Sequence, residues 1–438
     1  MNTEISIFWF RRDLRLDDNH GLYAALSLGR PVMPIFIFDP DILQKLDDKK
    51  DRRVDFIFQS LEYLNKYLKK NFNSGIHYFY DKPVDVFSEI CEKFSIKSVF
   101  CNEDYEPYAT ERDKNIKYLL GEKGVAFYLF KDQVLFHKDD IVKKDGKPYT
   151  VHTPYANNWL NKFRNEKSSI FISENRLEHL LAFNPNNFDI KYIGFQKTDI
   201  KFEIPKINEK IISSYDKTRD FMYDENGTSH LGIHLRFGTI SVRKLALKAS
   251  ILNEIFLKEL IWREFFMQIL YHYPYVEKKC FKPKYENIQW ENNETHFLKW
   301  CEGKTGFPLV DAGMRELNAT GFMHNRSRMI ASSFLVKHLL IDWRWGEAYF
   351  ANKLLDFDLA SNNGNWQWAS SSGCDAAPYF RIFNPIEQQK KFDPDFKYIK
   401  KWIPEFGTNK YPKPIVDHTF ARTRTLQRFK TNLNETYL

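Results

Sequence analysis

The sequence has few cysteines, and none is placed to suggest a disulfide framework or a metal cage. It carries five in 438 residues, at positions 91, 101, 280, 301 and 374. No two of them form a CxxC pair, the spacing typical of zinc sites and redox motifs. Stable disulfides belong to oxidising compartments. The cysteine content therefore favours a reducing compartment, and we expect no bound metal ion.

Long apolar runs are also missing. A transmembrane helix needs roughly 18 consecutive apolar residues, and no such run occurs here. The N-terminal stretch MNTEISIFWFRRD reaches Arg11 and Arg12 before the apolar core of a signal peptide could form. We therefore expect a cytoplasmic protein with no membrane partner, and we take it to be a monomer.

The sequence is rich in positive charge and in aromatic side chains. Its net charge is +8, and an excess of this size suits a polyanionic partner, although many unrelated proteins share it. Aromatic residues make up 16%, and most of the 39 phenylalanines are expected in hydrophobic cores. Core packing explains the 10 tryptophans less well, so their positions become candidates for function.

Residues 1–130 alternate between short apolar runs and stretches with helical spacing. The runs expected to be strands are 5–10, 31–38, 76–80 and 98–101, and the stretches expected to be helices are 19–28 and 54–68. This alternation indicates a parallel α/β sheet. The turn after the first strand reads RRDLRLDDNHG and lacks the GxGxxG with which a dinucleotide-binding fold approaches a pyrophosphate. We therefore do not expect a dinucleotide site in this half.

The remainder of the chain is predicted to be a linker and a helical domain. Residues 131–204 contain KKDGKP and NPNNFD and show little periodicity, so we expect a linker that runs over the surface. Helical patterns dominate after that, as in 241–273 and 326–338. The predicted organisation is an α/β domain over 1–130, a linker over 131–204 and an all-α domain over 205–438.

Four side chains near LIWREFF share one face of a predicted helix. Glu259, Trp262, Arg263 and Phe266 follow the i, i+3, i+4, i+7 spacing. A carboxylate, an indole and a guanidinium on one stripe could hold a flat polar ring beside a phosphate. The alternative is a surface salt bridge with the indole at the edge of the core.

Charged residues further along the chain leave similar alternatives. Arg326 and Arg328 lie near a helix start, where the helix dipole disfavours cations, so either they have anionic partners or they are solvated. Asp356 and Asp358 are followed by asparagines rather than by more acids or histidines, which argues against a metal site.

The stretch 227–229, GTS, precedes an apolar run and resembles an N-cap that could hold a phosphate. Most Ser and Thr caps bind nothing, so this signal is weak.

The stretch LASNNGNWQW places two tryptophans two residues apart. On a helix, Trp366 and Trp368 point about 200° away from each other, so they cannot share a role. One is expected to face inward and the other to face a cavity. Asn363 and Asn365 are expected to serve in capping and local hydrogen bonds.

Together these stretches closely resemble the photolyase/cryptochrome family, and within it the class I cyclobutane pyrimidine dimer photolyases. FWFRRDLRLDDNHGL is similar to the N-terminal signature of the family. WREFF, TGFPLVDAGMREL, TGFMHNRSRMIASSFLVK, DWRWGEAYF and DFDLASNNGNWQWASSSGCDAAPYFRIFNP follow in the order of its C-terminal signature. The resemblance extends over nearly the whole chain. It implies an N-terminal parallel α/β antenna domain, a long linker and a C-terminal all-helical domain that binds FAD.

The resemblance also implies a reaction, the light-driven repair of UV-damaged DNA by a carbon–carbon lyase. Excited FADH⁻ would give one electron to a cyclobutane pyrimidine dimer that has been flipped out of the duplex. The two cyclobutane bonds would split, and the electron would return to the flavin.

The cofactor contacts follow from the same resemblance. Arg328 and Asp356 match an ion pair beside the isoalloxazine ring, and Asn362 matches the residue that faces flavin N5. Gly232 stands where relatives commonly have Ser, so one hydroxyl contact is lost. The full set of implied cofactor contacts is Tyr215, Thr228, Ser229, His230, Leu231, Gly232, Arg328, Asp356, Asp358 and Asn362.

The implied DNA contacts divide by chemistry. Indole faces would stack on the pyrimidines, Glu259 and Asn325 would hydrogen-bond the thymine edges, and three arginines would bind flanking phosphates. The full set is Glu259, Trp262, Arg263, Asn325, Arg326, Met329, Trp368 and Arg381.

Three tryptophans match an electron-transfer triad that would reduce the oxidised flavin under light. They are Trp290, Trp343 and Trp366. Each alone could be core packing, but three at matching positions favour the triad. With Glu259 and the amides of Asn325 and Asn362, they complete the residues expected to take part in catalysis.

Three other branches of the family remain as alternatives. A (6-4) photolyase would have two histidines where this chain has Asn325 and Met329, although His324 is present. A signalling cryptochrome would not need the retained lesion contacts. The DASH branch is favoured by Phe322 and Asn365, whereas NWQW and AAPYFRIFNP favour class I.

The sequence does not identify the antenna chromophore. Tyr108 and Ala109 stand where a folate-binding relative would have Asn-Glu. Folate, a deazaflavin, a second flavin or no second chromophore at all are each compatible with the sequence.

Overall fold

The computed structural model describes residues 4–166 and 169–433 and divides into two compact units. The α/β unit comprises Met1–Ile141, Asn158–Ile207 and Leu231–Lys248, and the helical unit comprises Val142–Asn157, Asn208–His230 and Ala249–Leu438. The two fold classes are those predicted, whereas the boundaries at 130 and 204 stay predictions.

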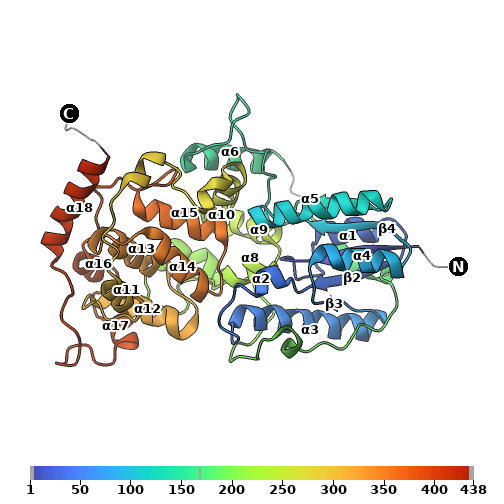
Figure 1. Ribbon diagram of the computed structural model, residues 1–438, viewed down its shortest axis with the longest axis horizontal. Coiled ribbons are helices and arrows are strands. Elements are labelled where there is room, and N and C mark those ends of the chain that lie inside the picture. Colours follow the sequence, from blue (N-terminus) through green and yellow to red (C-terminus); the bar gives the residue numbers. More distant parts are fainter. Residues whose placement is uncertain (1–3, 167–168, 434–438) are drawn as a thin grey trace. The chain divides into compact units, whose positions relative to one another are not determined.

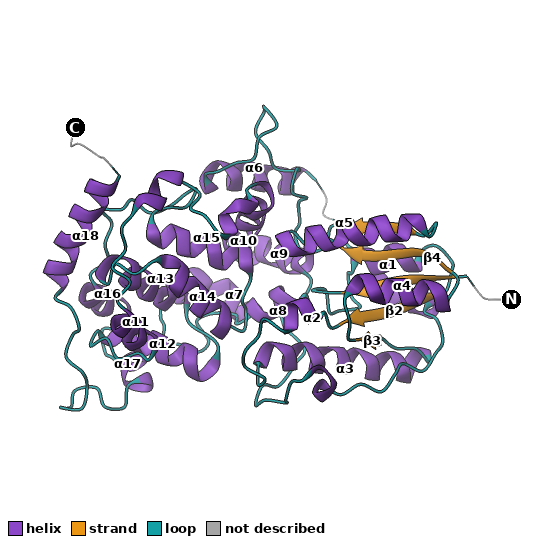
Figure 2. Cartoon of the chain, in the orientation of Figure 1, coloured by secondary structure: helices purple, strands orange, loops and turns teal. Residues whose placement is uncertain are grey.

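The α/β unit is built on a five-stranded parallel sheet, drawn in orange in Figure 2, with strand order β3-β2-β1-β4-β5. The strands are β1 (Ile5–Phe10), β2 (Val32–Ile37), β3 (His77–Phe79), β4 (Ile96–Asn102) and β5 (Ala126–Phe130). The helices that follow or cover them are α1 (His20–Leu26), α2 (Pro40–Leu43), α3 (Arg52–Phe72), α4 (Pro83–Lys93), α5 (Pro107–Glu122) and α8 (Gly232–Phe237), with 3₁₀ turns η1 (Ser173–His179) and η2 (Ile190–Ile193).

Both faces of this sheet are buried, which explains why β1 reads ISIFWF without a polar side. Phe8 and Phe10 pack in one hydrophobic cluster with residues of α1 and α3. Ile7 and Trp9 pack in another with residues of α4 and α5. Because a parallel sheet is covered by helices on each face, its central strand is mainly apolar on both faces, and the buried Ser6 is satisfied by a hydrogen bond to Ser98.

All four predicted strands are confirmed, and β5 was missed. β5 pairs only with β4 at the edge of the sheet, and its side chains are half-buried or exposed. Its sequence AFYLF is an apolar run like those of the predicted strands, so the signal was present along the chain and the prediction did not include it.

Buried charges fix the residues after β5 within the α/β unit. Arg15 and Arg243 each donate to the carboxylate of Asp132 at 2.8 Å, and all three are nearly inaccessible. Burial alone would raise the pKa of Asp132, but the two guanidinium groups outweigh it and lower the pKa to about 2. Removal of one partner from such a buried set costs about 3–5 kcal/mol, so the network holds these segments in register.

The helical unit contains most of the predicted site residues. Figure 1 labels its helices from α10 on, and Figure 2 also labels α7. Its elements are α7 (Glu209–Thr218), α10 (Glu254–His272), η3 (Pro274–Glu277), η4 (Pro283–Asn287), α11 (Glu294–Cys301), α12 (Pro308–Thr320), α13 (Asn325–Ser333), η5 (Phe334–His338), α14 (Trp343–Lys353), α15 (Leu359–Ser370), α16 (Pro385–Phe392), α17 (Lys397–Trp402) and α18 (His418–Asn432). Two further helices, α6 (His152–Asn165) and α9 (Val242–Leu252), contribute residues to both units.

Two predicted long helices are interrupted. The pattern over 241–273 is broken at Asn253, whose side chain accepts from the backbone N–H groups of Ile255 and Phe256 and so caps α10. The pattern over 326–338 ends as α13 and continues as the π-helical turn η5. Apolar spacing alone detects neither change. Ile251 and Ile255 beside the first break are apolar but exposed, and the second break lies among buried residues, so the apolar pattern continues across both.

The segment predicted as a surface linker is partly buried. Tyr155 and Trp159 of α6 are 2% and 0% exposed. The expectation of a purely superficial path is therefore wrong at α6. Among the described residues no helix combines the length and the apolarity needed to cross a membrane.

One lysine lies inside the core of the helical unit. Lys337 in η5 is 1% exposed, its Nζ donates to Ser371 Oγ at 2.8 Å, and it lies 4.0 Å from the centroid of the Phe429 ring. In the part of the chain that the structure describes, no carboxylate pairs with it. Burial lowers the pKa of Lys337 to about 7.

This burial predicts a pH-dependent stability. Between pH 7 and about 10 the unfolded chain binds a proton at Lys337 that the folded chain does not, so stability rises with pH in this window. We expect Lys337→Met to raise the free energy of unfolding, by on the order of a few kcal/mol at pH 7 and by less at pH 10. Denaturant titrations at both pH values measure this, with the exposed Lys299→Met of α11 as control. An equal effect at both pH values would contradict the prediction.

Candidate functional site

An ion pair joins the start of α13 to the segment before α15. Arg328 Nη2 donates to Asp356 Oδ2 at 2.9 Å, and its Nε donates to the carbonyl oxygen of Met323 at 2.8 Å. Both charged side chains are half-buried. The expected anionic partner of Arg328 is therefore present within the chain, and the guanidinium group is held in one orientation.

Asn362 is tied to a carboxyl group that the sequence did not suggest. Its Nδ2 donates to Glu347 Oε1 at 3.0 Å and to the Glu347 carbonyl oxygen at 3.1 Å. Burial raises the pKa of Glu347 to about 7, although the bond from Asn362 opposes this. The group beside Asn362 thus changes protonation near neutral pH.

Asp358 caps α15 by accepting from the N–H of Ser361.

A chain of charges joins α10 to α13. Arg219 Nη1 donates to Glu259 Oε1 at 2.5 Å, and Arg326 Nε donates to Asp220 Oδ1 at 2.8 Å. Arg219 and Asp220 are neighbours in sequence, so the two pairs form one network. Asn325 Nδ2 lies 3.9 Å from Met329 Sδ, as expected from i, i+4 spacing.

Arg219 and Asp220 were missed by the sequence analysis. They follow α7 in a stretch without periodicity, and their relevance depends on side chains 40 and 106 positions away. Tyr215, one turn earlier, lies under the Arg219 guanidinium at 5.3 Å and packs edge-on against Phe256. The network therefore connects a predicted cofactor residue with the predicted lesion residues.

The predicted stacking residues differ in their surroundings. Trp262 is half-buried and lies against the ring of His152 at a centroid distance of 3.4 Å. Trp368 and Arg263 are also half-buried. Arg381 is exposed, with its guanidinium 5.7 Å from the ring of Phe383, so it is accessible to an anion.

The two tryptophans of NWQW separate by burial, as the helical angle predicts. Trp366 is 2% exposed and packs against Phe350 at 5.0 Å, whereas Trp368 is half-buried. Asn363 Oδ1 accepts from Gln367, and Asn365 Nδ2 donates to the Ser361 carbonyl oxygen. The expected local hydrogen bonds of these two amides are confirmed.

The three tryptophans of the expected triad belong to one hydrophobic cluster of the helical unit. Trp343 and Trp366 are members of its buried core, and Trp290 is a half-buried residue packed against it. Trp290 lies 6.0 Å from Phe429, measured between ring centroids. Trp343 and Trp366 are therefore buried, and the side chain of Trp290 is the most exposed of the three.

The predicted N-cap at 227–229 is wrong. Helix α8 begins at Gly232, its N-cap is Leu231, and no side chain caps it. Thr228 and Ser229 are half-buried, and His230 adopts a left-handed backbone with its ring 4.6 Å from Phe322. The segment is an irregular loop. Leu231 and Gly232 fall in the residues of the α/β unit, and the other predicted cofactor residues fall in the helical unit.

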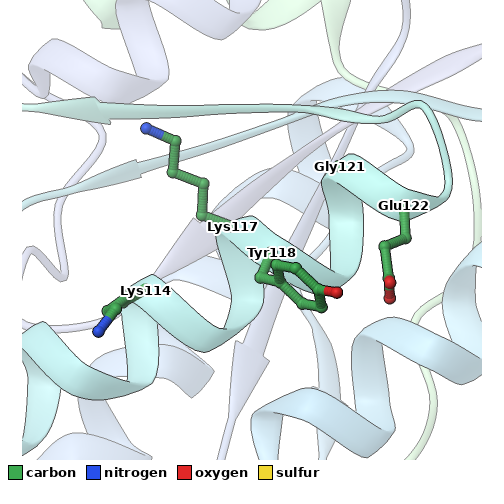
Figure 3. Close-up of a pocket in the computed structure, with 5 residues that line it drawn as sticks. All are labelled: Lys114, Lys117, Tyr118, Gly121 and Glu122. Carbon is green, nitrogen blue, oxygen red and sulfur yellow. The ribbon is translucent and has the colours of Figure 1, made fainter.

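In the α/β unit, the positions of Tyr108 and Ala109 offer little that resembles a chromophore site. Tyr108 donates to Asp39 Oδ2 at 2.5 Å, and Ala109 is buried. Figure 3 shows a shallow depression on α5 lined by Lys114, Lys117, Tyr118, Gly121 and Glu122. All five residues come from one helix, and Tyr118 is 71% exposed. A single helix face lacks the convergent polar groups of a binding pocket, so we assign no ligand to it.

Comparison with known proteins identifies the family. A family model described as DNA photolyase matches residues 6–171, and a model described as the FAD binding domain of DNA photolyase matches residues 256–409. A deoxyribodipyrimidine photo-lyase of Vibrio cholerae is 35% identical over 97% of this chain and 99% of its own length. The chain belongs to the DNA photolyase family.

Solved photolyases support the same placement. A class III photolyase of Agrobacterium tumefaciens superposes with a TM-score of 0.88 at 31% identity, covering 99% of each chain. A Sulfolobus tokodaii photolyase, described with two FAD molecules, has a TM-score of 0.83 at 35% identity, covering 98% of this chain and 100% of its own. The predicted family and its FAD-binding domain are confirmed. The class I assignment stays a prediction, because the relatives include a class III enzyme.

The side chains present fit a flavin. An isoalloxazine ring has hydrogen-bonding groups along one edge and gains negative charge on reduction. The half-buried Arg328, held between Asp356 and Met323, and the amide of Asn362 supply fixed polar groups of suitable kind. We expect FAD to be held by these residues.

Loss of Arg328 is expected to weaken flavin binding. Charge-assisted hydrogen bonds contribute about 1.5–3 kcal/mol, which corresponds to roughly 10- to 100-fold in affinity. Arg328→Ala should therefore lower the flavin-to-protein absorbance ratio of the purified protein. Arg315→Ala is the matched control, since Arg315 forms a similarly half-buried pair with Glu405 at 2.6 Å. Retained flavin in Arg328→Ala, or equal loss in both variants, would argue against the assignment.

Proposed function

We propose that the protein repairs cyclobutane pyrimidine dimers in UV-damaged DNA by light-driven electron transfer. The observation that carries this proposal is the charge network of Glu259, Arg219, Asp220 and Arg326. It joins lesion-contact candidates on α10 and α13 at half-exposed positions. The relatives named as deoxyribodipyrimidine photo-lyases support the same reaction.

We assign the binding of the flavin ring to side chains of the helical unit. Arg328, Asp356 and Asn362 would hold the flavin ring, and Tyr215 with the loop that includes Thr228 and Ser229 would hold the remainder. When bound, reduced FAD supplies the light-excited electron and takes it back after the dimer has split.

The protein residues supply binding and electrostatics. Glu259 accepts from Arg219 through Oε1, which leaves Oε2 to accept from a pyrimidine N–H. Arg326 forms an ion pair with Asp220, and both side chains are half-exposed. Such a pair is weak, so an incoming phosphate can replace the carboxylate. Displacement of such pairs by DNA predicts an affinity that falls with salt.

The tryptophan cluster supports a route for reduction from the surface. Trp366 and Trp343 are buried and Trp290 is half-buried in the same cluster. One electron would pass inward from Trp290 through Trp343 and Trp366, and an external thiol would refill Trp290. Protein side chains alone provide this route.

One observation disfavours the (6-4) alternative. His324 is 4% exposed, and its Nδ1 accepts from the N–H of Arg326 as the N-cap of α13. Burial lowers the pKa of His324 to about 4, so it is neutral at pH 7. A neutral capping histidine is a poor proton donor to a lesion.

Repair activity and the role of Glu259 can be tested together. Reduced protein and dimer-containing duplex DNA are illuminated with blue light, and restored thymines are counted. We expect repair by the natural protein and a roughly 10- to 100-fold lower rate at limiting DNA for Glu259→Ala, because one charged hydrogen bond to the lesion is lost. Flavin content should not change.

The control for this experiment is Glu254→Ala on the same helix, where Glu254 pairs with Lys258 at 2.8 Å on the surface. No restored thymines with the natural protein would refute the proposal. Repair of single-stranded DNA alone would favour the DASH branch. Loss of flavin in Glu259→Ala would show that Glu259 serves the cofactor instead.

Trp366 is expected to serve reduction and not repair. Trp366→Phe should greatly slow the light-driven reduction of oxidised flavin, because phenylalanine is much harder to oxidise. Repair by chemically reduced protein should be unchanged. Trp300→Phe is the control, since Trp300 is buried 6.1 Å from Trp366 in the same cluster. Normal photoreduction in Trp366→Phe would remove Trp366 from the route.

A further inference from the structure

A histidine ring lies flat on the indole that we assign to lesion binding. The rings of His152 and Trp262 have centroids 3.4 Å apart and an interplanar angle of 1°. This is the closest and most nearly parallel contact that either ring makes among the described aromatic pairs. It covers one face of an indole that is otherwise half-buried.

The imidazole is held firmly on its other sides. His152 begins α6, and its backbone N–H donates to Asp375 Oδ2 at 2.9 Å. The edge of its ring meets Phe265, which is fully buried, at 5.6 Å and 83°. The backbone of His152 is thus fixed at a helix start by a carboxylate, and its ring lies between Trp262 and the buried Phe265.

Within the part of the chain that the structure describes, no hydrogen bond of the ring explains its presence. His152 is 7% exposed, and its Nε2 has no partner among the described residues. Burial lowers the pKa of His152 to about 4, against the opposing charge of Asp375. Near neutral pH the contact is therefore a stack of two uncharged rings, and its planar shape is the property that matters.

We propose that His152 is a positioning residue for lesion recognition: it covers one face of Trp262 and holds the indole ready to receive a pyrimidine ring. The proposal rests on the dimer-binding role of Trp262 in the proposed function. Without the imidazole, the indole could tilt into the vacated space, and each bound lesion would have to order it again. Preorganisation of this kind raises affinity without any contact between the positioning residue and the ligand.

The test measures dark binding of a fluorescent duplex with one thymine dimer, and of the same duplex without damage, by anisotropy. We expect His152→Ala to weaken binding of damaged DNA roughly three- to tenfold, because aromatic pairs contribute about that much beyond area burial. Affinity for undamaged DNA should stay the same. The loss should also be similar at low and high salt, unlike a loss of phosphate contacts.

Two variants control for a merely structural role. His152→Phe keeps a flat ring over Trp262 and should restore damage-specific binding. His20→Ala removes a comparable stack in the α/β unit, where His20 lies 3.7 Å from Phe171 at 12°, and should leave damage recognition unchanged. Equal weakening of both DNAs, or no rescue by phenylalanine, would overturn the proposal. If His152→Ala loses flavin or helical signal, His152→Leu, which keeps volume without a plane, replaces it.

A measurement without DNA separates this inference from the proposed function. Hydroxyl-radical footprinting read by mass spectrometry reports the accessibility of Trp262. Oxidation of Trp262 should increase in His152→Ala and stay at the natural level in His152→Phe. If the natural protein fails to prefer damaged DNA, the proposed function fails while the footprint still tests the stack. Unchanged oxidation of Trp262 in His152→Ala would refute the positioning role itself.

Discussion

The close packing of α15 against α10 and α14 is the constraint on which the rest of the candidate site depends. A Cβ atom at Gly346 would lie 2.1 Å from Trp366, and one at Gly364 would lie 2.1 Å from Phe266. Real Cβ atoms do not come so close to other atoms. The contact of α14 with α15 therefore requires the glycine at 346, and the contact of α10 with α15 requires the glycine at 364. With α15 fixed on two sides, Trp366 is directed into the core, Trp368 stays accessible and Asn362 reaches Glu347. Three separate roles thus follow from one packing arrangement.

The charges around this packed core are paired within the chain. Arg219 with Glu259 and Arg326 with Asp220 are half-exposed pairs. Pairs of this kind stabilise the fold by only about 0–1 kcal/mol, so a ligand can exchange them at little cost. The buried pairs of Arg15 and Arg243 with Asp132 are different, because each ion there is isolated from water. Strong, buried pairs maintain the fold, and weak, accessible pairs are available for binding.

Much of the fold could be predicted because its signals are local. The apolar runs of β1 to β4 and the helical spacing of α3 are properties of neighbouring residues. The edge strand β5 was missed although its sequence AFYLF is as apolar as the strands that were predicted. The break at Asn253 was missed because an N-cap is defined by hydrogen bonds from backbone N–H groups to its side chain, and apolar spacing carries no information about them. At the candidate site, Arg328 and Asp356 were expected as a pair, whereas Glu347 was not, since nothing in α14 marks it.

The sequence by itself determined the family, the two fold classes and the residue types available for chemistry, because motifs and periodicity are written along the chain. Tertiary structure decided which of those residues meet. The stack of His152 on Trp262 joins positions 110 residues apart, and the bond from Arg219 to Glu259 joins positions 40 apart. No spacing rule extends over such separations, since only the packing of α6, α7 and α10 brings these side chains within a few ångströms of each other.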